Sequence, residues 1–151
     1  MLRTKLIHPE LLAALGSAGH GAKVLIADGN YPVGTKAPPR AARIYLNLSP
    51  GVVTVTDVLD ALVEAIPIEA AEVMVPDKGR EPPIFAEFRK ILKRSTTALP
   101  LQAGDLPLTT LSRFAFYDAA SQPDVAIAVS TGEKRIYANV LLTIGVVDPK
   151  A

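Results

Sequence analysis

Cysteine is absent from this 151-residue chain, and histidine occurs only twice. Without cysteine the chain forms neither a disulfide framework nor a thiolate site for zinc or an iron–sulfur cluster. Basic and acidic residues nearly balance, 16 against 15, so the formal net charge is +1. This balance removes the bulk electrostatic attraction that nucleic acids and anionic membranes exert on basic proteins. We therefore expect a small or neutral molecule as the partner, with no nucleic acid and no membrane.

A long apolar run is also missing at the beginning of the chain. Residues 1–5 lead directly into a helix pattern and not into the apolar core of a signal peptide, and no stretch there is long enough to span a bilayer. A cytoplasmic location is the expectation. Hydrophobic residues make up 49% of the chain and charged residues 21%, a composition typical of folded proteins. We expect one domain over residues 1–151.

Helix-like and strand-like segments alternate along the chain. Residues 9–18 begin with a proline, place leucines on one face and end at a glycine, which predicts a short helix. The continuous apolar run 24–27 is typical of a strand that is covered on both faces. Further strands are predicted within 44–48, 73–75, 125–129 and 139–144, further helices within 54–66, 82–94 and 113–117, and surface loops over 30–43 and 98–107. The alternation predicts an α/β fold, a single-domain three-layer α/β/α sandwich around a central, mostly parallel mixed sheet.

The signatures of common cofactor and metal enzymes do not occur. The chain has no G-x-G-x-x-G after its first predicted strand, no Walker A lysine, no G-x-S-x-G elbow and no pair of histidines spaced for zinc. We therefore expect no cofactor and no metal. The remaining candidates are isolated polar residues at the ends of apolar segments: His20, Asp28, Arg113, Tyr137 and Asn139.

His20 and Asp28 flank the first predicted strand. His20 stands between Gly19 and Gly21, which provide little cover, so a small molecule can reach its imidazole. A histidine ordinarily titrates near about pH 6.5 and can both donate and accept a proton at neutral pH. Asp28 follows the strand at its carboxyl end, where open α/β sheets bind ligands. An acid–base histidine with a nearby carboxylate, which orients either the imidazole or a hydroxyl group of the ligand, is the first functional hypothesis.

Four of the five candidates also have a purely structural interpretation. His20 could cap the carboxyl end of the preceding helix, and Asp28 could satisfy the backbone of its own Asp-Gly turn. Arg113 could form an ion pair with Asp118 or Glu133. Tyr137 could pack against another subunit, and His8, which precedes a proline, is expected to be an exposed residue at the start of a helix.

Five short motifs are distributed over nearly the whole chain: Gly19-His20-Gly21, Asp28 followed by Pro32, Arg113-Phe114-Ala115-Phe116-Tyr117, Thr131-Gly132-Glu133, and Tyr137-Ala138-Asn139-Val140-Leu141-Leu142. Taken together, these motifs resemble the D-ribose pyranase and L-fucose mutarotase family. The resemblance implies a cofactor-free enzyme that interconverts cyclic forms of a free monosaccharide. It implies that His20 is the proton donor and that Asp28, Arg113, Tyr137 and Asn139 contact the sugar. It also implies a cyclic homo-oligomer, often a decamer, with sites near subunit contacts.

Within this family the string after Arg113 is similar to the L-fucose mutarotase branch, whereas Asn30-Tyr31 departs from both branches. An aromatic wall beside an arginine suits a sugar with one methyl edge and several hydroxyls, because the methyl group leaves water while the guanidinium binds oxygens. L-fucose is therefore the expected substrate. The alternatives are a D-ribose pyranase, a non-catalytic sugar-binding or transport-accessory protein, and a structural protein that only forms oligomers.

Overall fold

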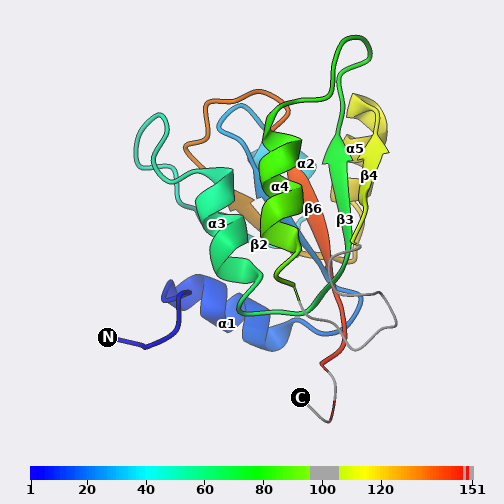
Figure 1. Ribbon diagram of the computed structural model, residues 1–151. Helices are drawn as coiled ribbons and strands as arrows, with labels where there is room; N and C mark the ends of the chain where they lie inside the picture. Colours follow the sequence, from blue (N-terminus) through cyan, green and yellow to red (C-terminus); the bar gives the residue numbers. More distant parts are fainter. Residues whose placement is uncertain (96–105, 148, 150–151) are drawn as a thin grey trace.

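A computed structural model describes residues 1–95, 106–147 and 149. These residues form one six-stranded sheet in the order β2-β5-β1-β6-β3-β4 (Figure 1). The strands are β1 (Lys23–Ala27), β2 (Ala42–Tyr45), β3 (Ile68–Met74), β4 (Leu108–Leu111), β5 (Val125–Ser130) and β6 (Val140–Ile144). Neighbouring strands are parallel except where β6 pairs with β1 and with β3. The predicted mixed, mostly parallel sheet is confirmed.

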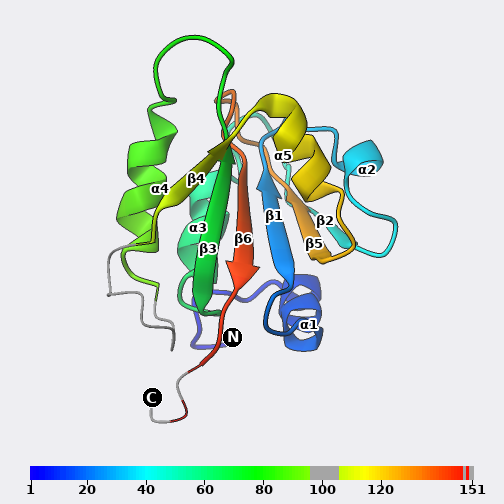
Figure 2. The ribbon, with the colours of Figure 1, turned by 90° about the vertical axis from the view of Figure 1, so that its right-hand side faces the viewer.

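Helices cover both faces of the sheet, as Figures 1 and 2 show. They are α1 (Pro9–Ser17), α2 (Val33–Lys36), α3 (Val55–Leu62), α4 (Ile84–Leu92) and α5 (Arg113–Ala120). One core contains buried side chains of α1, α3 and α4, and the other contains those of α2 and α5. Val24 and Ile26 of β1 lie in the first core, and Leu25 and Ala27 lie in the second. A strand that is buried on both faces explains the uninterrupted apolar run of β1.

Side chains cap the starts of α1, α3 and α5, close to where the sequence predicts these helices. Thr54 and Asp57 form a capping box at the start of α3, in which each side chain accepts from the other residue's backbone N–H. Ser112 Oγ accepts from the backbone N–H of Ala115 at the start of α5. His8 is half-buried and its Nδ1 accepts from the backbone N–H of Leu11, at 3.2 Å. His8 is therefore a helix-start residue, as predicted, but less exposed than expected.

The structure differs from the sequence-based expectations at the edges of the sheet. The alternating pattern predicts a strand within 44–48, whereas β2 begins at Ala42 and ends at Tyr45. Residues 30–43 contain the four-residue helix α2 as well as loop. The edge strand β4 has only half-exposed and exposed side chains, so it carries no apolar run and the sequence does not predict it. Most of the expected loop 98–107 lies outside the described residues.

The direction of the strands places their ends at two opposite edges of the molecule. In Figure 2 the arrows of β1 and β3 point up and the arrow of β6 points down. The carboxyl ends of the five parallel strands therefore meet the amino end of β6 at one edge, called here the carboxyl edge. The turn between α1 and β1 lies at the other edge, where the N–H of Gly21 donates to the carbonyl of Ile144, the last residue of β6. In the described part of the chain, no helix has the length and apolar character needed to cross a membrane.

Candidate functional site

Asp28 and Asn139 form a reciprocal pair at the carboxyl edge. Asp28 follows β1 and Asn139 precedes β6, and these two strands are antiparallel neighbours. The backbone N–H of Asp28 donates to Asn139 Oδ1 at 2.8 Å, and Asn139 Nδ2 donates to Asp28 Oδ2 at 3.0 Å. Only 3% of each residue is exposed. The sheet therefore brings together two predicted site residues that are 111 positions apart in the chain.

The second carboxylate oxygen of Asp28 accepts a hydrogen bond from the backbone of the turn that Asp28 begins. Asp28 Oδ1 accepts from the backbone N–H of Asn30 at 2.9 Å, so the structural interpretation of Asp28 holds for this oxygen. Burial raises the pKa of Asp28, while the hydrogen bonds from Asn30 and Asn139 oppose that rise. Each carboxylate oxygen keeps acceptor capacity after these bonds. Asp28 is thus held rigidly and is still able to accept a hydrogen bond from a ligand.

Arg113 begins helix α5 at the same edge. Its Nε donates to Tyr117 Oη at 3.3 Å, and its guanidinium carbon lies 5.6 Å from the centre of the Tyr117 ring. In the part of the chain that the structure describes, Arg113 forms no ion pair with Asp118 or Glu133, and Glu133 is paired with Arg135 instead. The structural interpretation, an ion pair of Arg113 with Asp118 or Glu133, is therefore wrong. The other N–H groups of the guanidinium are available to hydroxyl oxygens.

Four of the five predicted site residues line one cavity of about 250 Å³. The lining consists of Asp28, Asn30, Tyr31, Met74, Arg113, Tyr117, Ile136, Tyr137 and Asn139. Tyr137 has a φ of +59°, a left-handed conformation that is uncommon for a residue other than glycine and that concentrates at functional sites. A carboxylate, a guanidinium, a carboxamide and phenols stand beside two apolar side chains. Such a mixture of donors, acceptors and apolar surface suits a polyhydroxylated ligand.

The aromatic wall of this cavity differs from the one that the sequence predicts. Phe114 is 72% exposed and Phe116 is fully buried, so of the string after Arg113 only Tyr117 lines the cavity. Tyr31 and Tyr137 provide the other two rings. Sequence reasoning missed Tyr31 as a lining residue, although its position three residues after Asp28 was a usable signal.

His20 lies at the opposite edge of the sheet from this cavity. The five residues of β1, at about 3.3 Å each, put roughly 16 Å of strand between His20 and Asp28. The imidazole is 59% exposed, and its Nε2 lies 3.0 Å from Glu69 Oε2. The hypothesis that Asp28 orients His20 is therefore wrong within one chain, because Glu69 is the carboxylate beside it. His20 is not the cap of α1 either. The cap residue is Ala18, whose backbone N–H donates to the carbonyls of Ala14 and Leu15.

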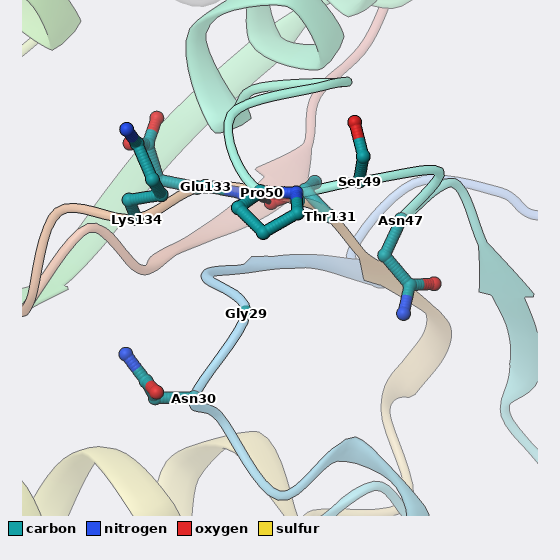
Figure 3. A pocket seen from close by; sticks show the side chains of 9 residues that line it. Gly29, Asn30, Asn47, Ser49, Pro50, Thr131, Glu133 and Lys134 are labelled. Carbon is teal, nitrogen blue, oxygen red and sulfur yellow. Dashed lines mark hydrogen bonds between the residues drawn. The ribbon is translucent and has the colours of Figure 1, made fainter.

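A second cavity of about 460 Å³ lies at the carboxyl edge, beside the first, and shares Asn30 with it. Figure 3 shows its side chains, which come from the loops after β1, β2 and β5. They are Asn30, Asn47, Ser49, Pro50, Thr131, Glu133 and Lys134, together with Gly29 and Gly132. None of the five predicted site residues lines this larger cavity. Over residues 1–95, 106–147 and 149, no three His, Asp or Glu side chains are grouped to hold a metal ion.

Known proteins match this chain over nearly its whole length. The model of the RbsD / FucU transport protein family matches residues 1–147. A D-ribose pyranase of Paracidovorax citrulli is 35% identical over 97% of this chain and 98% of its own length. A fucose mutarotase of Danio rerio is 32% identical over 94% of this chain and 90% of its own.

Two solved structures with bound sugars have similar folds. The fucose mutarotase of Streptococcus pneumoniae in complex with L-fucose has a TM-score of 0.77 and 27% identity, covering 98% of this chain and 100% of that one. RbsD of Bacillus subtilis complexed with D-ribose has a TM-score of 0.72 and 25% identity, with the same coverage.

Proposed function

We propose that this chain, which belongs to the RbsD / FucU transport protein family, is a sugar mutarotase that interconverts cyclic forms of a free monosaccharide. One observation carries the proposal. Asp28, Arg113, Tyr137 and Asn139, which come from three distant segments, line a single cavity. Relatives named for activity on ribose and on fucose support the reaction class. The reaction needs no electron transfer and no external nucleophile, only proton transfers to and from the sugar.

The cavity residues bind and orient the sugar in this proposal. Asp28 accepts hydrogen bonds from sugar hydroxyls, and Arg113 donates to their oxygens. Asn139 has one Nδ2 hydrogen left after its bond to Asp28, which it donates to the ligand. Because the Asp28–Asn139 pair is buried and fully constrained, these groups keep their positions before the sugar arrives. Binding therefore costs little reorganisation of the site.

His20 supplies the proton transfers. Its protonated imidazole donates to the ring oxygen as the bond between that oxygen and the anomeric carbon breaks. The anomeric hydroxyl gives its proton to solvent water, the aldehyde C=O forms, and the ring opens. Rotation about the bond to the aldehyde carbon and the reverse transfers then close the ring in another form. No proton is consumed overall, which suits a histidine that works in both directions. The contact between Nε2 and Glu69 leaves Nδ1 as the nitrogen without a partner in the described structure.

A second copy of the chain must provide this histidine. His20 and the sugar cavity lie at opposite edges of the sheet, so the two halves of the site do not meet in one protomer. His20 is exposed and stands on a glycine-flanked turn, so a neighbouring copy can receive it. We infer that each site joins the cavity of one protomer to the His20 of its neighbour in a closed homo-oligomeric ring of this chain. A decamer is the assembly we propose.

L-fucose is the substrate that the cavity suits best. Met74, Ile136 and the ring of Tyr117 offer apolar surface beside Arg113, which matches a methyl edge next to hydroxyls. A methyl contact of this kind changes a specificity ratio by about 10- to 200-fold. We expect L-fucose anomers to exchange faster than D-ribose ring forms by that factor. The relative named D-ribose pyranase makes ribose the second candidate.

Saturation-transfer NMR on equilibrated L-fucose and D-ribose tests the proposal. The protein should increase the exchange rate, and His20→Ala should lower the catalysed rate by about 10²- to 10⁴-fold while the fold is retained. His8→Ala is the matched control, because it removes the other histidine, which caps the amino end of α1, whereas His20 follows the carboxyl end. Binding without acceleration of exchange would replace the enzyme by a sugar-binding protein. Faster exchange on ribose would make the chain a ribose pyranase and leave the role of His20 unchanged.

A further inference from the structure

Tyr31 lines the sugar cavity, and its hydroxyl group is buried without a hydrogen-bond partner in the described part of the chain. Tyr31 is only 7% exposed. Its ring packs edge-on against Phe116, with centroids 6.1 Å apart, and against Tyr117, with centroids 5.4 Å apart. The ring position is thus fixed by packing, and the hydroxyl contributes nothing to that packing.

An unpartnered buried hydroxyl is unfavourable for the ligand-free protein. Buried polar groups are almost always hydrogen-bonded, and leaving one unpaired costs its full desolvation penalty. Phenylalanine would fill the same space and make the same edge-on contacts without that penalty. A tyrosine at this position therefore calls for a partner that appears only in the bound state.

A backbone turn connects Tyr31 to Asp28, whose side chain lines the same cavity. The backbone N–H of Tyr31 donates to the carbonyl of Asp28 at 3.1 Å, so one turn presents both side chains to the ligand. Burial raises the pKa of Tyr31, and the neighbouring Tyr117 and Asp28 raise it further. The phenol therefore keeps its proton throughout the neutral range and acts as a donor.

We propose that Tyr31 is a specificity-determining residue whose O–H donates to one hydroxyl oxygen of the bound sugar. The inference rests on the proposed sugar site and deepens it. It requires a sugar with an oxygen at the edge that faces the Asp28–Tyr31 turn. A deoxy sugar that lacks this oxygen leaves Tyr31 unpaired in the complex as well, so the site discriminates against it.

Tyr31→Phe separates this role from a structural one. The variant should melt at the same temperature as the unmodified protein, or a few degrees higher, when no sugar is present, because it loses only an unpaired group. Its dissociation constant for the preferred sugar should rise about 3- to 10-fold, the factor contributed by one neutral hydrogen bond. Tyr45→Phe removes the same atom from an exposed residue outside both cavities and should change neither quantity.

Titration with a series of monodeoxy analogues of the preferred sugar identifies the recognised oxygen. For one analogue, Tyr31→Phe and the unmodified protein should bind equally, since the protein group and the sugar group form one pair and their losses do not add. Equal affinity of both proteins for the intact sugar would overturn the inference. A fall in the ligand-free melting temperature would also overturn it, because it would show that the hydroxyl has a structural partner. If the unmodified protein bound no monosaccharide, the proposed function itself would fail, which is a distinct result.

Discussion

At the scale of single residues, two buried carboxylates are held in opposite ways. Burial dominates at Asp28 and raises its pKa, whereas hydrogen bonds from Arg135 dominate at Glu133 and lower its pKa. Glu133 is only 4% exposed, and it accepts from the backbone N–H, Nε and one terminal nitrogen of Arg135, at 3.1, 2.9 and 2.7 Å. Asp28 is thus suited to accept a hydrogen bond from a ligand, whereas the hydrogen bonds of the Glu133 carboxylate to Arg135 stabilise the fold.

The lowered pKa of Glu133 predicts a pH-dependent stability. A carboxyl group whose pKa is lower in the folded than in the unfolded state stabilises the fold above its ordinary value of 4.5, and this stabilisation is lost as the pH falls through the folded value. Glu133→Gln should therefore destabilise the protein by about 1–2 kcal/mol at pH 7, and by progressively less in acid. Glu87→Gln, which changes the exposed second partner of Arg135, should have little effect. Thermal unfolding of both variants between pH 7 and 3 measures this; a constant difference at Glu133 would contradict it.

At the scale of elements, the segment 131–139 between β5 and β6 supplies three of the nine residues that line the sugar cavity. It carries Tyr137 and Asn139 across the carboxyl edge. The hydroxyl of Thr131 donates to the carbonyl of Ala27 at 2.8 Å, and the N–H of Gly29 donates to the carbonyl of Glu133 at 2.9 Å. The segment is therefore attached to the end of β1, where Asp28 begins.

Gly132 lies in close contact with the loop after β2, and its backbone N–H donates to the carbonyl of Val53 at 2.8 Å. A Cβ atom there would overlap the backbone carbonyl oxygens of Ser49 and Val52, which cannot move as a side chain could. Gly132→Ala should lower the free energy of unfolding by about 3 kcal/mol and weaken sugar binding by displacing the segment. Gly16→Ala, in an open position of helix α1, should instead stabilise the protein by about 0.5–1 kcal/mol. Denaturant unfolding of the two variants checks this, and equal effects would refute the packing argument.

The elements also show which parts of the molecule could be predicted from sequence. The buried strand β1 and the capped helix α3 were predictable because apolar runs and cap residues act locally. The edge strand β4 was not, because its pairing with β3 is a long-range contact that leaves no apolar pattern. The same distinction between local and long-range signals applies to the cavity. Asp28 and Asn139 were predictable because they are polar residues at strand ends, whereas Met74 and Ile136 line the cavity only through tertiary packing.

At the scale of the whole molecule, the sheet itself separates the two halves of the proposed site. Sequence reasoning placed His20 and Asp28 near one another because they lie close in the chain. A strand converts that sequence proximity into distance, since residues before and after it occupy opposite edges. In the mechanism we propose, His20 and Asp28 act on one sugar only when a second protomer supplies the histidine, and assembly is then a condition for activity.

Subunit mixing provides the decisive prediction. His20→Ala and Arg113→Ala should each be nearly inactive alone, the first without the proton donor and the second without a sugar-binding guanidinium. When the two variants are denatured together and refolded at equal amounts, His20 of one subunit can meet the intact cavity of the other. Random assembly makes about one site in four complete, so about a quarter of the unmodified exchange rate should return. Light scattering should show a high-order oligomer at micromolar concentration throughout. A mixture that stays inactive, or an unmodified protein that catalyses exchange as a monomer, would refute the shared site.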